Sequence, residues 1–176
     1  MEVTGVQTCA LPISEISSEA IKKMFDRLDE LQEGDILVLA GSIPASMPES
    51  MYRDIMKRLA DRKLKIAVDA TKSLLLNVLP FHPFVIKPNN HELGELFNVK
   101  IKSKDQAVEY AKKLQEMGAQ NVIVSMAGEG AVFVGDDGSV FQSEAPKGTV
   151  VNSVGAGDSM VAGFLAGYLG EGDYKE

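Results

Sequence analysis

The sequence predicts an α/β fold: a mainly parallel sheet with helices on both faces and an antiparallel hairpin at one edge. Short, nearly continuous apolar runs alternate with segments of helical periodicity, which is typical of parallel strands joined by helices. Late in the chain, two short strand-like segments flank Asp136, Asp137 and Gly138, a sequence that favours a hairpin turn. No internal repeat or low-complexity linker divides the chain, so we expect one layered domain.

The composition limits the classes of partner. The 176 residues, 45% of them apolar, suffice for one domain with a buried core, and no apolar run approaches the roughly 18 residues that cross a bilayer. A net charge of -7 argues against broad contact with nucleic acid phosphates, but not against a small anion held by a few local groups. Cys9 is the only cysteine, which excludes an internal disulfide and a zinc site built on thiolates. We therefore expect a cytoplasmic enzyme with no nucleic acid or membrane partner.

Residues 1–14 differ from the rest of the chain. Met1–Ser14 has no clear period, contains the lone cysteine and resembles the translated adapter sequence that contaminates some assembled genes. We hypothesise that this segment is not native to the protein. The alternative is a disordered native tail. In either case, residues 15–176 are expected to form the domain.

The chain then begins with a helix and a strand. Apolar residues recur at helical spacing between a serine cap, Ser17 or Ser18, and about Gln32, and Gly34 ends the helix. The nearly continuous apolar run at 35–40 is typical of a strand that is buried on both faces.

The middle of the chain repeats this alternation. Pro48 stands where the first turn of a helix tolerates proline, and apolar side chains follow on one face. Ser103 is a cap for a later helix that Gly118 ends. The same patterns predict strands at 65–70, 84–87 and 121–126, helices at 73–79, 90–97 and 103–117, hairpin strands at 131–135 and 140–143, and a last helix after Gly155.

The turn that opens the last helix, VGAGDS at 154–159, carries the clearest chemical signal. Gly155 and Gly157 let backbone N–H groups approach an anion at a helix N-terminus, where the helix dipole also favours the ionised form of Asp158. A carboxylate beside an anion site suits a base that accepts a hydroxyl proton during phosphoryl transfer. The alternative, a helix cap with glycines that permit close packing, is equally compatible with this motif alone. Met160 excludes the dinucleotide fingerprint, which needs a third glycine there.

A second polar segment, KPNNHE at 87–92, follows a predicted strand directly. Lys87 can pair with a phosphate as a point charge. Asn89 and Glu92 can address one site across a helix start, through a hydrated Mg²⁺. The alternative is a helix entry capped by Asn89 or Asn90, which the motif alone favours.

Two more segments follow predicted strands. SMAGEG at 125–130 offers flexible backbone for the phosphates or sugar of a nucleotide, and GSIP at 41–44 offers the hydroxyl of Ser42. Each is also compatible with a simple turn. His82 and His91 are isolated and receive no role. Because ligands bind beyond the carboxyl ends of parallel strands, four such segments at one edge together indicate a binding site.

The four segments, GSIP, KPNNHE, SMAGEG and VNSVGAGDSMVAGF at 151–164, resemble in order and spacing the PfkB (ribokinase-like) carbohydrate kinases. The combination of KPNxxE with NSVGAGDS is most similar to the branch of bacterial 1-phosphofructokinases and tagatose-6-phosphate kinases. The resemblance extends from about Glu15 to the end. It implies a ribokinase-like three-layer α/β/α fold and transfer of the γ-phosphoryl group of ATP to a sugar hydroxyl.

The resemblance also implies roles for individual residues. Asp158 would be the base, and Gly155, Ala156 and Gly157 would form the anion hole. Asn89 and Glu92 would position Mg²⁺ through water, Lys87 would approach the nucleotide phosphates, and Ser42, with Asp158, would lie near the sugar phosphate. The predicted ATP site consists of Lys87, Asn89, Ser125, Met126, Ala127, Gly128, Glu129, Gly130, Gly157 and Asp158.

The implied activity is that of an ATP-dependent hexose-phosphate kinase that converts fructose 1-phosphate to fructose 1,6-bisphosphate. Tagatose-6-phosphate kinase and a non-catalytic module that binds a nucleotide or sugar phosphate are the alternatives. Members of the family begin with further strands and a small β lid, through which they often dimerise. We therefore expect residues 15–176 to be a partial kinase domain with an exposed sheet edge, inactive in isolation.

Overall fold

The protein folds around one twisted sheet. The computed structural model describes residues 16–44, 46–150 and 152–171, so the hypothesis about Met1–Ser14 lies outside the described residues. Within this part of the chain the sheet has six strands in sequential order. They are β1 (Ile36–Ala40), β2 (Lys65–Asp69), β3 (Val85–Ile86), β4 (Asn121–Ser125), β5 (Ala131–Val134) and β6 (Val140–Ser143).

The pairing of the strands confirms the predicted fold class. β1 to β4 are parallel neighbours, with Val38 opposite Ala67 between β1 and β2. β5 and β6 turn back as an antiparallel hairpin, with Ile123 of β4 opposite Phe133 of β5. The parallel pairs are joined by helical crossovers, whereas the hairpin needs only a short turn.

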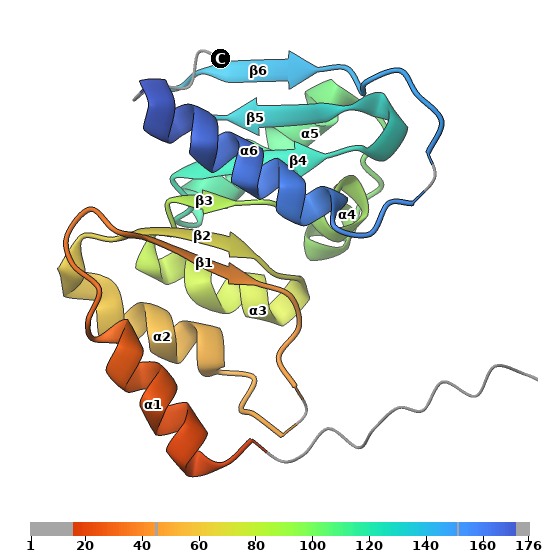
Figure 1. The fold of residues 1–176 in the computed structure, drawn as a ribbon. Helices are drawn as coiled ribbons and strands as arrows, with labels where there is room; N and C mark the ends of the chain where they lie inside the picture. The colour runs from red at the N-terminus through yellow and green to blue at the C-terminus, as the bar shows by residue number, and fades with distance from the viewer. Residues whose placement is uncertain (1–15, 45, 151, 172–176) are drawn as a thin grey trace, which may run out of the picture.

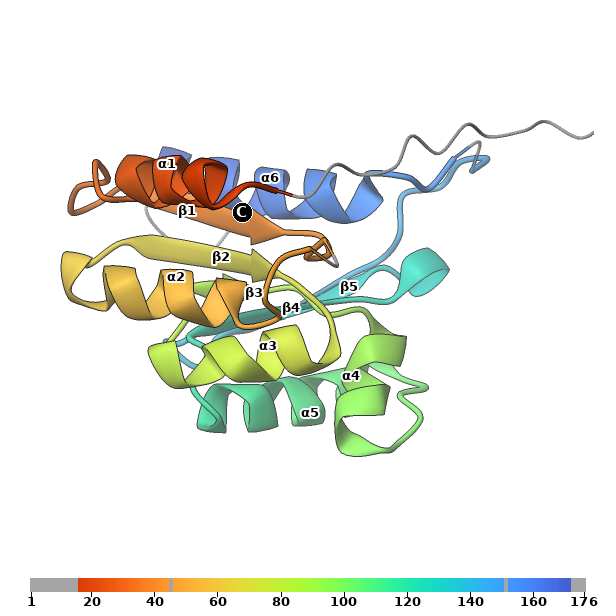
Figure 2. The same cartoon turned by 90° about the horizontal axis from the view of Figure 1, so that it is seen from below.

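Helices cover both faces of the sheet unequally (Figures 1 and 2). Figure 2 shows α2, α3 and α5 on one side of the sheet and α6 on the other. None of the helices within the described ranges is both long and apolar enough to cross a membrane. The helices are α1 (Ser18–Leu28), α2 (Met51–Leu59), α3 (Lys72–Val78), α4 (Asn90–Phe97), α5 (Lys104–Glu116) and α6 (Ala156–Glu171), with short 3-10 turns η1 (Ala60–Arg62), η2 (Leu79–Phe81) and η3 (Ala127–Glu129).

Two apolar cores result from this arrangement. The larger lies between the sheet and α2 to α5, and the apolar side of α1 packs against it. The smaller lies under α6, where Val161 and Leu165 meet apolar residues of β2, β3 and β4. An aromatic group reinforces it, because the ring of Phe84 lies 4.9 Å from that of Tyr168 and 6.2 Å from that of Phe164. These contacts fix the position of α6 across the sheet.

The predicted serine caps are present, but the predicted end of the first helix at about Gln32, before Gly34, is wrong, because α1 ends at Leu28 with Asp29 as its C-cap. The hydroxyls of Ser17 and Ser103 accept backbone N–H groups at the starts of α1 and α5, as the sequence predicts. The prediction that Pro48 lies in the first turn of a helix is wrong. α2 begins at Met51, and the carbonyl of Pro48 accepts the Met51 N–H in a turn ahead of the helix.

The prediction that the first strand is buried on both faces is also wrong. β1 is an edge strand of the described sheet, and 45% of Val38 is exposed. Leu37 and Leu39 belong to the larger core, so the other face of the strand is the uncovered one. α6 packs against β2 to β5 and leaves most of this face of β1 open.

Two adjacent leucines of α3 test the position of the core. Leu75 is 1% exposed and Leu76 is 38% exposed. We expect Leu75→Ala to lower the free energy of unfolding by about 2–5 kcal/mol, because it leaves a cavity. Leu76→Ala should change it by about 0.5 kcal/mol or less. Urea denaturation of both variants measures the difference, and equal losses would contradict this assignment of the core.

Candidate active site

The predicted motifs at the ends of β1, β3 and β4 lie at one edge of the sheet. The N–H of Gly41 donates to the carbonyl of Asp69 at 3.1 Å, which joins the turn after β1 to the end of β2. The N–H of Ser125 donates to the carbonyl of Pro88 at 3.1 Å, and Asn89 forms a parallel bridge with Ser125. Parallel register therefore places GSIP beside β2 and KPNNHE beside SMAGEG.

The N-terminus of α6 lies against Lys87. Gly155 has a φ of +79°, a conformation that glycine adopts without strain. A Cβ placed on Gly157 would lie 3.0 Å from Nζ and 3.3 Å from Cε of Lys87. The first turn of α6 therefore presents its backbone directly to the amine, and Asp158 in the same turn is exposed. This combination of a helix N-terminus and a cation suits an anion.

Lys87 is held in place by a carboxylate that sequence reasoning missed. The residue is only 6% exposed, and its Nζ lies 3.2 Å from Oδ2 of Asp69 at the end of β2. Asp69 also approaches the first turn of α6, since a Cβ on Gly157 would lie 3.4 Å from its Oδ2. The available signal was an acidic residue that ends an apolar strand, KIAVD, at the edge where ligands bind.

Tyr52 stabilises the turn that contains Ser42 through hydrogen bonds to the backbone. Its hydroxyl, on α2, donates to the carbonyls of Ala40 and Gly41 at 2.7 and 3.2 Å. Burial, and secondarily the charge of Asp69, raise the pKa of Tyr52, so the hydroxyl stays protonated and remains a donor. Ser42 itself is exposed. Local periodicity assigned Tyr52 to a helix but could not reveal this long-range bond.

Asn89 and Glu92 form a capping box at the start of α4. Oδ1 of Asn89 accepts the N–H groups of His91 and Glu92, both at 2.9 Å. Oε2 of Glu92 accepts the N–H of Asn89 at 2.8 Å. The structure therefore shows the helix cap by Asn89 that was the alternative interpretation of KPNNHE.

The described residues provide no preformed metal cage. No group of three or more His, Cys, Asp or Glu side chains among them could hold a metal ion. Mg²⁺ commonly binds through one or two carboxylates, several waters and the substrate's phosphates. Glu92 fits such a role as a single carboxylate.

The segment at 125–130 divides into buried and open parts. The side chain of Met126 lies in the larger core, and its N–H donates to the carbonyl of Gly130. Neither group is therefore available to bind a nucleotide. Gly130 is required by packing, because a Cβ there would lie 1.9 Å from the carbonyl oxygen of Ser143. Ala127, Gly128 and Glu129 are exposed. The last two border a hollow of about 470 Å³ that Lys102 and Lys104 also line.

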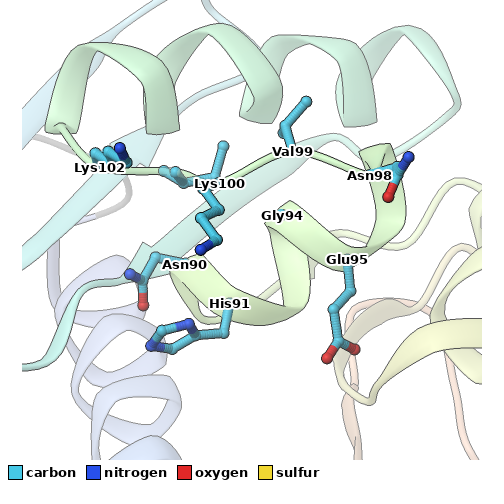
Figure 3. Close-up of a pocket in the computed structure, with 9 residues that line it drawn as sticks. Asn90, His91, Gly94, Glu95, Asn98, Val99, Lys100 and Lys102 are labelled. Carbon is cyan, nitrogen blue, oxygen red and sulfur yellow. The ribbon is translucent and has the colours of Figure 1, made fainter.

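Another pocket, of about 750 Å³, lies along α4 and the loop that follows it (Figure 3). It contains none of the predicted catalytic residues, although Asn90 directly follows Asn89. In Figure 3, Lys100 extends from the loop toward the first turn of α4. The remaining lining residues are His91, Gly94, Glu95, Asn98, Val99, Ile101 and Lys102.

Two glycines of α6 test the contact with Lys87. At Gly163 a Cβ would have no neighbouring atom within 4 Å, so Gly163→Ala should raise the free energy of unfolding by roughly 0.5–1 kcal/mol. Gly157→Ala should leave the protein at least about 1 kcal/mol less stable than Gly163→Ala, because the buried amine of Lys87 must move. Chemical denaturation gives both values, and equal stabilisation would contradict the close contact.

The Lys87–Asp69 ion pair can be compared with an exposed pair of the same length. Asp69→Asn should lower the free energy of unfolding by up to about 3–5 kcal/mol, because it leaves a buried ammonium group without its carboxylate. Glu33→Gln removes the exposed partner of Lys63, also at 3.2 Å, and should cost about 1 kcal/mol or less.

A double variant completes this test. Adding Lys87→Met to Asp69→Asn should recover most of the loss, because no charge is then buried alone. Additive losses in urea denaturation would show that the two side chains are not coupled.

The chain is similar in sequence to known carbohydrate kinases. The family profile described as "pfkB family carbohydrate kinase" matches residues 3–176. The chain is 49% identical over 152 residues to a 1-phosphofructokinase of Bacillus subtilis (strain 168), covering 86% of this chain and 50% of that protein. It is 33% identical over 151 residues to a D-tagatose-1-phosphate kinase of Bacillus licheniformis, covering 85% and 49%.

The fold has solved counterparts as well. Phosphofructokinase-2 from Escherichia coli, crystallised with substrates and products, superposes with a TM-score of 0.81 at 27% identity, covering 90% of this chain and 52% of that one. The chain thus spans about half the length of the relatives it matches. The profile nevertheless covers nearly all of this sequence, including the segments that converge at the sheet edge, and the chain therefore belongs to the pfkB family of carbohydrate kinases.

Proposed function

We propose that the chain carries the phosphoryl-transfer half of an ATP-dependent hexose-phosphate kinase, which converts fructose 1-phosphate to fructose 1,6-bisphosphate. The observation that supports this most is the contact between the first turn of α6 and the buried amine of Lys87. It joins an anion-binding backbone, a fixed positive charge and the carboxylate of Asp158 in one place. The 49% identity to a 1-phosphofructokinase supports the choice of sugar.

The proposed reaction uses Asp158 as general base. The C6 hydroxyl oxygen of fructose 1-phosphate attacks the γ-phosphorus of ATP, and the bond from that phosphorus to the β–γ bridging oxygen breaks. The hydroxyl proton passes to the carboxylate of Asp158, and ADP leaves. The N–H groups at Gly155–Gly157 and the amine of Lys87 stabilise the negative charge that develops on the transferred group.

The other predicted residues have positioning roles in this proposal. The exposed turn at 127–129 contacts ATP, and Ser42 binds the phosphate of the sugar. Glu92, with Asn89 indirectly, helps to hold the Mg²⁺ that accompanies ATP, and this ion supplies charge neutralisation at the phosphates when it is bound. Tyr52 positions the turn that contains Ser42, and Asp69 positions the amine of Lys87 at the same edge of the sheet.

We further propose that residues 15–176 are a partial kinase domain that is inactive alone. The chain spans half the length of its relatives, and the uncovered face of β1 is consistent with further structure in the complete enzyme. Tagatose phosphate is the alternative substrate, because a D-tagatose-1-phosphate kinase is 33% identical.

A joined enzyme tests the proposed function. The chain is fused to the half of the B. subtilis 1-phosphofructokinase that it does not match, and ADP release is followed with ATP, Mg²⁺ and fructose 1-phosphate. Asp158→Asn should reduce kcat by about 10²–10⁴-fold and leave ATP binding by calorimetry largely unchanged, because only the proton acceptor is lost. Asp61→Asn, in η1 before β2, is the matched control and should retain full activity.

Three results would count against the proposal. Turnover of no hexose phosphate by the fused enzyme would defeat the kinase function, and faster turnover of a tagatose phosphate would replace the substrate. If Asp158→Asn keeps its rate, the residue is a helix cap and not a base.

A further inference from the structure

The pocket along α4 carries positive charge that no acidic side chain balances. Its lining includes the amines of Lys100 and Lys102 and the carboxylate of Glu95. Glu95 already has a cation, since its Oε2 lies 3.4 Å from Nζ of Lys72, and Figure 3 shows its side chain directed away from Lys100. No carboxylate in the described part of the chain forms an ion pair with Lys100 or Lys102. The whole chain has a net charge of -7, so this positive charge is a local property of the pocket.

The loop that carries both lysines is fixed in place. Val99 packs against the larger core and Ile101 is buried in it, whereas Lys100 and Lys102 are exposed. The N–H of Lys102 also donates to Oε1 of Gln106 at 2.8 Å. Because buried apolar residues alternate with exposed basic ones, the two lysines lie on the side of the loop that faces away from the core.

Close contact between α4 and this loop shapes the pocket. The N–H of Val99 donates to the carbonyl of Gly94 at 2.9 Å. A Cβ on Gly94 would lie only 2.5 Å from the carbonyl oxygen of Val99, so only glycine lets the loop come this near to the helix. The volume of about 750 Å³ is in the range of small-molecule sites. The pocket is therefore large enough for a ligand as it stands.

The groups that line the pocket suit a phosphate. Figure 3 shows Lys100 extended toward the first turn of α4, where the carboxamide of Asn90 lies. A lysine amine binds phosphate as a point charge, and a carboxamide N–H can donate to a phosphate oxygen. The helix dipole is not needed, because Oδ1 of Asn89 already accepts the N–H groups of His91 and Glu92.

We propose that this pocket is a second anion site, which binds the phosphate group of a small phosphorylated metabolite between the amines of Lys100 and Lys102. It contains none of the residues assigned above to catalysis, ATP or the sugar phosphate. A nucleotide and a sugar phosphate both present such a group, and the phosphate is the part that the lysines recognise. The inference does not depend on the proposed function.

Amide chemical shifts in nuclear magnetic resonance spectra locate the bound anion. The full chain is titrated separately with inorganic phosphate, ribose 5-phosphate and AMP, and with adenosine as the uncharged control. We expect saturable shifts of the amides at 98–102 with all three phosphates and none there with adenosine. Tighter binding of AMP or of ribose 5-phosphate than of inorganic phosphate identifies the source as a nucleotide or a sugar phosphate. Shifts at Gly155–Gly157 report separately on the proposed phosphoryl-transfer site.

Three lysine variants test the contacts. Lys100→Gln and Lys102→Gln should each weaken the binding of inorganic phosphate at 98–102 by about fivefold or more, because each removes a charge-assisted contact. Lys112→Gln changes an exposed lysine of α5 that does not line the pocket, and should leave the affinity unchanged. Thermal melting checks that all three variants remain folded.

Several results would overturn the proposal. Equal losses in the three variants would show that the anion responds only to net charge, and undiminished affinity in Lys100→Gln and Lys102→Gln would exclude both amines. Shifts confined to Gly155–Gly157, or shifts at 98–102 that adenosine reproduces, would show that the pocket does not recognise phosphate.

Discussion

The buried amine of Lys87 is the constraint on which the arrangement of the sheet edge depends. A lysine that is 6% exposed needs a compensating charge, and Asp69 on the neighbouring strand supplies it at 3.2 Å. The ion pair also restricts the residue type at position 157 in the first turn of α6, because a side chain at Gly157 would collide with the amine of Lys87. One electrostatic requirement thus ties β2, β3 and the start of α6 to a common geometry.

Much of the fold could be predicted because its signals are local. Apolar runs, serine caps and the turn at 136–138 depend on neighbours in the sequence, and they located the elements to within a few residues. β1 was misjudged because its composition matches that of a central strand, whereas its exposure depends on what lies beside it. Pro48 was misplaced because proline suits a turn before a helix as well as its first turn.

The candidate site was predictable only in part. The four polar segments could be located because three of them follow a strand directly and the fourth opens a helix, but Asp69 and Tyr52 act through partners on other elements. The bond from Tyr52 to Ala40 and the pair of Asp69 with Lys87 exist only once the sheet has formed. For Asn89 and Glu92 the two interpretations need not compete. Their capping box fixes the start of α4, and the same fixed geometry would orient Glu92 for a bound ion.

The way α6 is attached has a consequence for the order of folding. Val161 and Leu165 pack on residues from β2, β3 and β4 that are far away in the sequence, and Phe164 and Tyr168 reach the ring of Phe84. Contacts of such long range carry the largest entropic cost of loop closure and tend to form late. These contacts can form only when β2, β3 and β4 lie side by side, so we expect the helix that bears Gly155–Asp158 to dock after the sheet is aligned.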